Sequence, residues 1–251
     1  MKYLLFFIFS TISISIYAQE SNKAFLVRYH GNFNSLFERS NNSRKVTATL
    51  LMEGDRSLFT MKETEDEVVD PSNISINLSP DSLFTVYKDI ESNSLVFDFM
   101  DLNQHPLYYA DTLYPMEWKI QDEEKSIHGV LCKLATTSFK GRNYNAWFTP
   151  TISISNGPWK LGGLPGLILE AYDDEMQWKL TFDSMVQCEP INFTRYDRII
   201  SNGINGYGGF TDYLKKMHNR LQHAFSAQAI GDCLTCDTKS VVKLYSWEKI
   251  N

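Results

Sequence analysis

Short segments in which hydrophobic and polar residues alternate recur along most of the chain, and others are rich in β-branched and aromatic residues. Both patterns are typical of β-strands that bury one face. Turn-forming clusters at 53–56, 79–82 and 91–94 are short enough to connect antiparallel neighbours. The pattern predicts strands at 25–29, 46–52, 58–61, 83–88, 95–100, 107–110, 117–120, 129–139, 143–149, 166–172, 176–185 and 241–247.

One helix is predicted in the C-terminal half of the chain, at residues 211–225, with Thr211 as the residue that caps its first turn. A glycine-rich segment at 202–209 precedes it and is interpreted as a hinge. The predicted fold is mainly β. It consists of a single domain, residues 19–251, with a curved, half-barrel-like antiparallel meander sheet and this helix packed on it through Tyr213, Leu214, Met217, Leu221 and Phe225.

The N-terminal residues have the pattern of a signal peptide. Lys2 supplies a short positive region, and an apolar stretch follows from Leu4 to Ile16. The small residue Ala18 precedes the expected cleavage point, so we expect residues 1–18 to be removed. An uncleaved anchor is the alternative, which the short stretch and the weakly basic flank disfavour. The sequence therefore predicts an exported protein without a transmembrane anchor after cleavage.

The charge of the chain bears on its partners. The formal net charge is −6 at pH 7 and becomes more negative when Lys2 leaves with the signal peptide. Basic residues form no run longer than Lys215-Lys216. A polyanion would therefore meet net repulsion, which excludes nucleic acid as an expected partner.

An oxidising compartment makes disulfides the expected state of the four cysteines, Cys132, Cys188, Cys233 and Cys236. Four thiols permit three pairings, which the sequence leaves open. We favour Cys132 with Cys188, which lie at the ends of predicted strands that we expect to be neighbours, and Cys233 could then close on Cys236. A redox-active pair at Cys233 and Cys236 is the disfavoured alternative, because the segment does not look like the start of a helix. Neither a metal nor another cofactor is expected.

The least ordinary segment is the glycine- and proline-rich loop at 157–166, whose mixture of free and fixed backbone angles indicates a definite shape. Its hydrophobic residues are too many for a solvated linker, so the loop either plugs one end of the sheet or covers a binding cleft. We favour the plug. A phosphate-binding loop is excluded because a strand follows. The candidate binding residues are Arg142, Trp147, Gly157, Pro158, Trp159, Gly162, Gly163, Leu164, Pro165 and Gly166.

Residues 163–168 read Gly-Leu-Pro-Gly-Leu-Ile, and blocks at 129–137, 141–142, 146–150 and 156–160 precede them. In these features the chain resembles the GLPGLI family, exported proteins of Bacteroidetes of unknown function. The resemblance covers about residues 115–175 and departs from the family pattern at Ser153, where proline is usual. It implies a periplasmic or outer-membrane-associated protein, often encoded among genes for nutrient receptors.

Two functions follow as hypotheses. In the first, the sheet wraps an apolar cleft, exposed aromatic residues such as Trp147 and Trp159 line it, and the protein binds an outer-membrane receptor or a small apolar or peptide ligand. In the second, the protein is a hydrolase of envelope polymers or peptides. Its acid and base groups would come from Asp173, Asp174 and Glu175 with Glu170 or Arg142. We favour the non-catalytic binding or accessory protein.

Overall fold

The computed structural model describes residues 23–34, 43–64, 82–100, 106–113 and 115–201. Within these residues the chain forms eleven strands and one short helix, α2, at Thr194–Ser201. The strands are β1 (Ala24–Asn34), β2 (Ser43–Glu53), β3 (Arg56–Glu63), β4 (Ser82–Asp89), β5 (Ser94–Met100), β6 (Pro106–Thr112), β7 (Lys119–Ile127), β8 (Val130–Phe139), β9 (Arg142–Thr149), β10 (Leu167–Asp173) and β11 (Trp178–Cys188).

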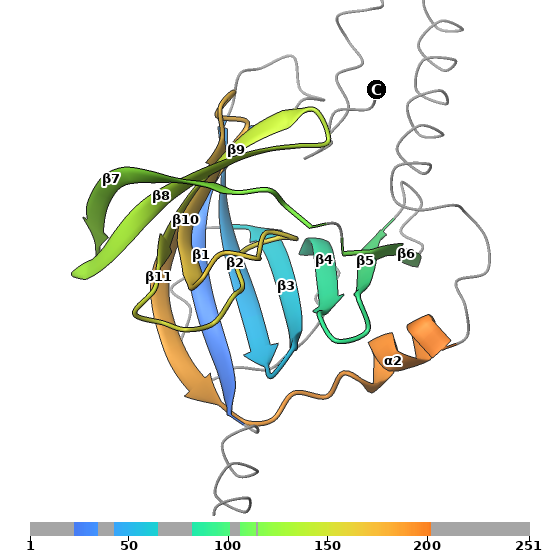
Figure 1. Ribbon diagram of the computed structural model, residues 1–251. Coiled ribbons are helices and arrows are strands. Elements are labelled where there is room, and N and C mark those ends of the chain that lie inside the picture. The colour runs from blue at the N-terminus through green and yellow to red at the C-terminus, as the bar shows by residue number, and fades with distance from the viewer. Residues whose placement is uncertain (1–22, 35–42, 65–81, 101–105, 114, 202–251) are drawn as a thin grey trace, which may run out of the picture.

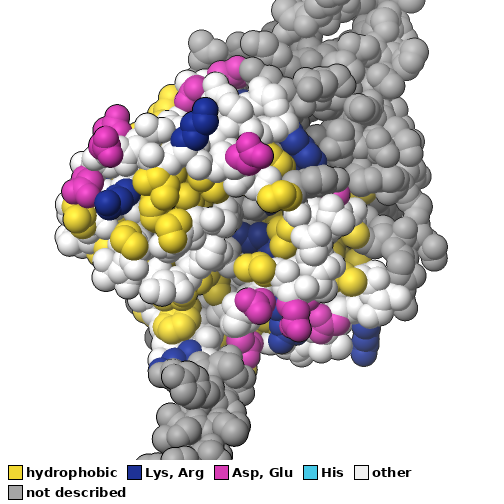
Figure 2. Space-filling model, in the orientation of Figure 1, with side chains coloured by type: hydrophobic (Ala, Val, Ile, Leu, Met, Phe, Trp, Pro, Cys, Tyr) yellow, Lys and Arg dark blue, Asp and Glu magenta, His cyan; other side chains and the backbone are white. Residues whose placement is uncertain are grey.

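All eleven strands belong to one open antiparallel sheet with the order β6-β5-β4-β3-β2-β1-β11-β10-β9-β8-β7. Two meanders, β1 to β6 and β7 to β11, are joined where β11 returns to pair with β1. The sheet curls strongly, so that the loop between β9 and β10 lies inside its curve (Figure 1). On the face turned to the viewer, hydrophobic side chains gather in patches with acidic and basic side chains around them (Figure 2). The predicted mainly β fold with a curved meander sheet is confirmed, and the predicted strand at 241–247 lies outside the described residues.

Each face of the sheet carries a hydrophobic cluster, and the two clusters bury different parts of the chain. Successive residues of a strand point to opposite faces, so neighbours such as Leu26 and Val27 belong to different hydrophobic clusters. Most of the larger cluster fills the concave side, and it includes residues of the β9–β10 loop. The smaller cluster lies on the convex side, where Ile191 and Phe193 cover strands β1 to β5.

Helix α2 is held on the convex face by aromatic and ionic contacts. The rings of Tyr196 and Tyr87 are stacked, with centroids 4.8 Å apart and planes 4° from parallel. Arg195 forms an ion pair with Asp98 of β5 at 3.0 Å. A helix packed on the sheet was expected, but at residues 211–225, which lie outside the described residues. Among the residues described, no helical segment has the length and hydrophobicity to span a bilayer.

Candidate functional site

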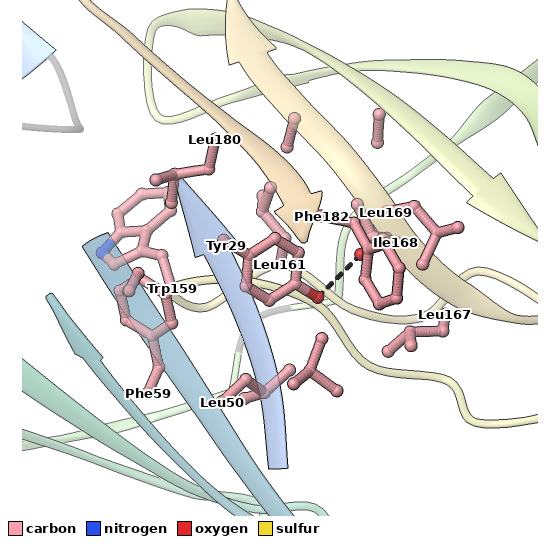
Figure 3. Packing of buried hydrophobic residues seen from close by; sticks show 14 of the residues in the cluster. Tyr29, Leu50, Phe59, Trp159, Leu161, Leu167, Ile168, Leu169, Leu180 and Phe182 are labelled. Atoms are coloured by element: carbon pink, nitrogen blue, oxygen red, sulfur yellow. Dashed lines mark hydrogen bonds between the residues drawn. The ribbon is translucent and has the colours of Figure 1, made fainter. Parts of the chain in front are cut away.

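The glycine- and proline-rich loop enters the concave side of the sheet and becomes part of its core. Trp159 is only 1% exposed, and Leu161 and Leu164 are equally buried. Figure 3 shows Trp159 and Leu161 among core residues that come from several strands. The Trp159 ring lies near those of Tyr144 and Trp178, with centroids 5.8 Å and 6.5 Å away. The expectation that Trp159 is an exposed aromatic residue is therefore wrong, because its ring completes the core.

A buried lysine fixes this loop to the sheet. Lys88 of β4 is 3% exposed, and its ammonium donates hydrogen bonds to three oxygens of the loop. The acceptors are Asn156 Oδ1 at 2.6 Å, the Gly157 carbonyl at 2.9 Å and the Leu161 carbonyl at 3.0 Å. Burial lowers the pKa of Lys88 from its ordinary value of 10.5 to about 7. Three acceptors match the three donors of an ammonium group, so they offset part of its desolvation.

A second lysine of the loop is buried among aromatic rings. The Lys160 ammonium lies 4.5 Å from the centroid of its neighbour Trp159 and 5.0 Å from that of Phe139 on β8. Burial is the main reason that the pKa of Lys160 lies well below its ordinary value, and the nearby Lys140 acts in the same direction. Cation–π contacts of this kind partly replace lost hydration. Both polar contacts and apolar packing thus hold the loop on the sheet.

Close packing explains two of the glycines. A Cβ at Gly157 would lie 2.7 Å from Ile168 Cδ1, and one at Gly166 would lie 2.1 Å from the Thr149 carbonyl oxygen. Gly166 also has φ of 154°, which disfavours other residues. The hydroxyl of Tyr29 donates to the Ile168 carbonyl at 2.8 Å across the core (Figure 3). The hexapeptide thus needs glycine where the chain turns from the plug into β10.

The remaining loop positions divide between core and surface. Pro158 and Leu164 are buried, whereas Gly163 and Pro165 are exposed. The Gly162 carbonyl accepts a hydrogen bond of 2.8 Å from the indole of Trp118, which ties the connection before β7 to the loop. The exposed positions are therefore few and carry no polar side chain.

Arg142 and Asp173 form a buried ion pair at the ends of β9 and β10. Arg142 Nη1 lies 2.5 Å from Asp173 Oδ2, and the two side chains are 8% and 1% exposed. The other carboxylate oxygen of Asp173 accepts hydrogen bonds from the backbone nitrogens of Gln177 at 2.7 Å and Trp178 at 3.3 Å. Each group therefore has its charge matched within the β10–β11 turn, an arrangement that orders the turn.

The carboxylates proposed for hydrolysis do not converge on one pocket. Asp173 and Glu170 are three residues apart on β10, so their side chains point to opposite faces of the sheet. Asp174 accepts a hydrogen bond from Asn145 at 2.5 Å, and Glu175 lies 3.6 Å from Arg142 at the exposed turn. These groups serve the turn and its neighbours, and none is paired with another carboxylate across a cleft in the described part of the chain.

The convex face of the same strands carries a cluster of charged and aromatic side chains. Register pairs Glu170 with Trp147 of β9 and with Thr181 of β11, so all three share this face. Glu170 Oε1 accepts from Lys125 Nζ at 2.8 Å and lies 3.1 Å from Lys179 Nζ. We call Lys125, Trp147, Glu170, Tyr172 and Lys179 the convex-face cluster.

Each lysine of the convex-face cluster lies over an aromatic ring. Lys125 Nζ is 4.4 Å from the Trp147 centroid, and Lys179 Nζ is 5.6 Å from that of Tyr172. Burial opposes the ionisation of Glu170, but the two lysines outweigh it and hold the pKa of this carboxyl below its ordinary value. Trp147 and Glu170 were each predicted from the sequence as candidates for different functions, whereas neither lysine was predicted. Strand alternation could have placed Tyr172 beside Glu170, but the contacts from β7 and β11 depend on the sheet order.

The favoured disulfide between Cys132 and Cys188 is wrong, because both are free thiols in the structure. Cys132 lies on β8 and Cys188 on β11, and the sheet order places β9 and β10 between these strands. Burial raises the pKa of the Cys132 thiol to about 11. Cys233 and Cys236 lie outside the described residues. Within the part of the chain that the structure describes, no three His, Cys, Asp or Glu residues are grouped so as to hold a metal ion.

Comparison with known proteins gives one family match. A family model described as "Protein of unknown function (Porph_ging)" matches residues 136–170. This segment contains all of β9, the glycine- and proline-rich loop at 157–166, which we call the plug loop, and the hexapeptide at 163–168. No curated protein matches the chain.

Two solved structures of PNGF-II, in the P21 and C2 space groups, are similar to the chain at 17% sequence identity and TM-scores of 0.45 and 0.47. The similarity covers 68% and 73% of this chain but only 29% and 30% of the PNGF-II chains. The chain therefore spans less than a third of the length of these PNGF-II structures.

Proposed function

We propose that the protein is a GLPGLI-type protein, exported to the cell envelope without residues 1–18, and that it acts there as a non-catalytic binding or accessory protein. The N-terminal pattern and the blocks around the hexapeptide support this proposal. The match of residues 136–170 to a family of unknown function falls on the same segment. We infer that it lies in the periplasm or is associated with the outer membrane, linked to a nutrient-receptor system.

The binding proposal rests on a difference between the two faces of strands β9 and β10, which flank the plug loop. Inward-facing residues of β9 and β10 pack against the plug loop, which occupies the concave side. Outward-facing residues of the same strands form the convex-face cluster, in which Trp147 and Tyr172 remain partly exposed. Tryptophan and tyrosine residues that stay accessible at a surface are enriched in binding sites. The binding surface is therefore the convex face, and the concave side is interior.

The hydrolase hypothesis lacks this kind of support. Acid–base catalysis of this kind needs titratable groups that converge on one substrate position. Here Asp173 is occupied by Arg142 and the turn amides, and Glu170 points to the other face with two lysines on one oxygen. Both carboxylates are used in contacts that order the sheet.

Native mass spectrometry of the protein taken gently from its own cell envelope tests the proposal. We expect a mature mass that begins at residue 19, together with a bound ligand or a co-purifying receptor. Trp147→Ala should lose this partner while the protein stays folded. Thr47→Ala, which changes a partly exposed residue of β2, is the control and should retain it. A chain found in the cytoplasm with its N-terminus intact, or turnover of an envelope polymer by the purified protein, would contradict the proposal.

A further inference from the structure

The convex-face cluster holds two ammonium groups next to a single carboxylate oxygen. Lys125 Nζ and Lys179 Nζ lie 2.8 Å and 3.1 Å from Glu170 Oε1. Both nitrogens are therefore close enough to each other for one further two-oxygen group to bridge them. The lysines come from β7 and β11, on either side of the strands that carry Trp147 and Glu170, so the sheet itself fixes their spacing.

The lysines are accessible, whereas the carboxylate between them is not. The side chains of Lys125 and Lys179 are 31% and 38% exposed, against 7% for Glu170. Glu170 Oε2 also accepts from the Thr181 hydroxyl at 3.3 Å. A ligand that approaches this face therefore meets the ammonium groups first. Each ammonium has three N–H donors, of which Glu170 takes one, so donors are left for a ligand.

The aromatic rings make this a prepared site. Lys125 is laid over Trp147 and Lys179 over Tyr172, which limits the side-chain freedom that a ligand would otherwise have to restrict. The rings also leave apolar surface beside the ammonium groups, and the hydroxyl of Thr181 adds a neutral polar group. The surface thus combines a pair of cations, partly exposed aromatic rings and a hydroxyl.

The charge of the cluster selects the ligand. Two lysines and one glutamate leave a local formal charge of one positive unit, which a single monovalent anion neutralises. A polyanion would meet the negative charge of the whole chain and of the exposed acidic residues Asp122, Glu123 and Glu124 on β7. A cation finds no free carboxylate here, because Glu170 already binds both lysines.

We propose that Lys125 and Lys179 bind the carboxylate of a small, otherwise uncharged molecule, such as an acidic sugar, with Trp147 and Tyr172 against its apolar surface. This inference names the ligand class for the convex-face surface and rests on the proposed binding function. Glu170 is a positioning residue in this site. It holds the two ammonium groups together and does not contact the ligand.

The test is an NMR titration of the purified full chain with sodium glucuronate, sodium acetate and glucose at constant ionic strength. The indole signal of Trp147, assigned with Trp147→Phe, reports on the site. We expect saturable shifts with glucuronate, weaker binding of acetate and no shift with glucose. Binding of glucuronate no tighter than that of acetate would still support the carboxylate site but would overturn the contribution of the aromatic rings.

Lysine variants separate the site from a surface effect. Lys179→Gln and Lys125→Gln should each weaken glucuronate binding about tenfold or more, because each removes a charge-assisted hydrogen bond. Lys133→Gln is the matched control, since Lys133 of β8 is 46% exposed and paired with Glu124 at 3.6 Å. It should bind as the wild type does. Absence of a saturable shift with either carboxylate, or equal affinity in all three variants, would overturn the proposal.

The outcome is independent of the envelope experiment. A protein that binds glucuronate but stays in the cytoplasm would overturn the proposed function and leave the carboxylate site standing. An exported protein that captures a partner but does not bind carboxylates would do the reverse. In Lys179→Gln, Glu170 stays paired with Lys125, so we expect this variant to fold. The NMR spectrum of each variant is compared with that of the wild type before titration to check that it is folded.

Discussion

Replacing Lys88 by methionine should release the plug loop from the sheet. The substitution keeps the length and the apolar stem of the side chain but removes the ammonium that donates to Asn156, Gly157 and Leu161. Asn156 Oδ1 keeps a second donor, the backbone nitrogen of Gly157 at 2.8 Å. The carbonyls of Gly157 and Leu161 lose this donor in a buried setting.

The size of the effect follows from these two carbonyls. A buried acceptor that loses its donor costs about 1–3 kcal/mol, and the removed ammonium returns part of its own desolvation cost. We therefore expect Lys88→Met to lower the free energy of unfolding by about 2–4 kcal/mol. Lys62→Met on β3 replaces an exposed strand lysine and should change it by less than about 0.5 kcal/mol.

Lys88 should also make stability depend on pH in a defined direction. Its pKa is about 7 in the folded protein and 10.5 ordinarily, so between these values the unfolded chain binds more protons. The free energy of unfolding should then rise with pH, by up to about 1.4 kcal/mol per pH unit. Below pH 7 both states are protonated and the contribution of Lys88 is constant. In Lys88→Met this rise is absent.

Urea unfolding of the wild type, Lys88→Met and Lys62→Met between pH 6 and 9.5 measures both effects. The difference between wild type and Lys88→Met should increase as the pH rises above 7, and amide exchange at Leu161 should accelerate in the variant at every pH. A loss of stability no larger than that of Lys62→Met would refute the anchoring of the loop by Lys88. A difference that stays constant with pH would refute the lowered pKa and show that the three acceptors keep the lysine charged.

Three further substitutions test the packing of the signature segment, each by urea unfolding. Gly157→Ala should lower the free energy of unfolding by about 1–3 kcal/mol, because its Cβ would lie 2.7 Å from Ile168. Gly54→Ala is the comparison: it has open space around it and φ of 58°, and it should lower the free energy of unfolding by about 1 kcal/mol. Trp159→Ala should cost about 3–5 kcal/mol, since it empties a core position that is 1% exposed; a loss below 1 kcal/mol would contradict the plug. Asp173→Asn should lower the free energy of unfolding by about 3 kcal/mol, because it leaves the buried charge of Arg142 with only the more distant, half-exposed carboxylate of Glu175; an unchanged midpoint would show that the remaining contacts are enough to order the turn.

The strands could be predicted from sequence because each buries one face or both. Alternation at 46–52 and 143–149 reflects a real difference between the two sides of β2 and β9. The predicted strand at 117–120 covers only the start of β7, because the run Asp122, Glu123 and Glu124 shows no strand pattern. These residues are exposed at the edge of the sheet, where charge discourages further pairing and carries no apolar signal. A highly charged edge strand such as β7 is therefore the part of this fold that periodicity reveals least.

The contacts of the site could not be predicted because they join residues that are distant in sequence. Lys88 meets Asn156 across 68 positions, and a lysine within a strand pattern gave no reason to expect burial. Helix α2 is short, and only Tyr196 is fully buried on it, so its sequence carries no long apolar stripe. The pairing of Cys132 with Cys188 failed for a related reason. The strands that carry the two cysteines were taken as neighbours in the sheet, whereas β9 and β10 lie between β8 and β11.

The same alternation that makes β9 and β10 strands also explains how one short signature segment can serve two purposes. Ala146 and Ala171 face inward as small residues that leave room for the plug, and they are paired across the two strands. Trp147 follows Ala146, and Glu170 precedes Ala171. Both must therefore face outward, because successive residues of a strand point to opposite faces. A constraint on the plug therefore fixes the register that brings Trp147 beside Glu170. If the convex-face cluster binds a ligand, substitutions in the loop that shift this register, such as Gly166→Ala, should weaken binding although they lie on the opposite face.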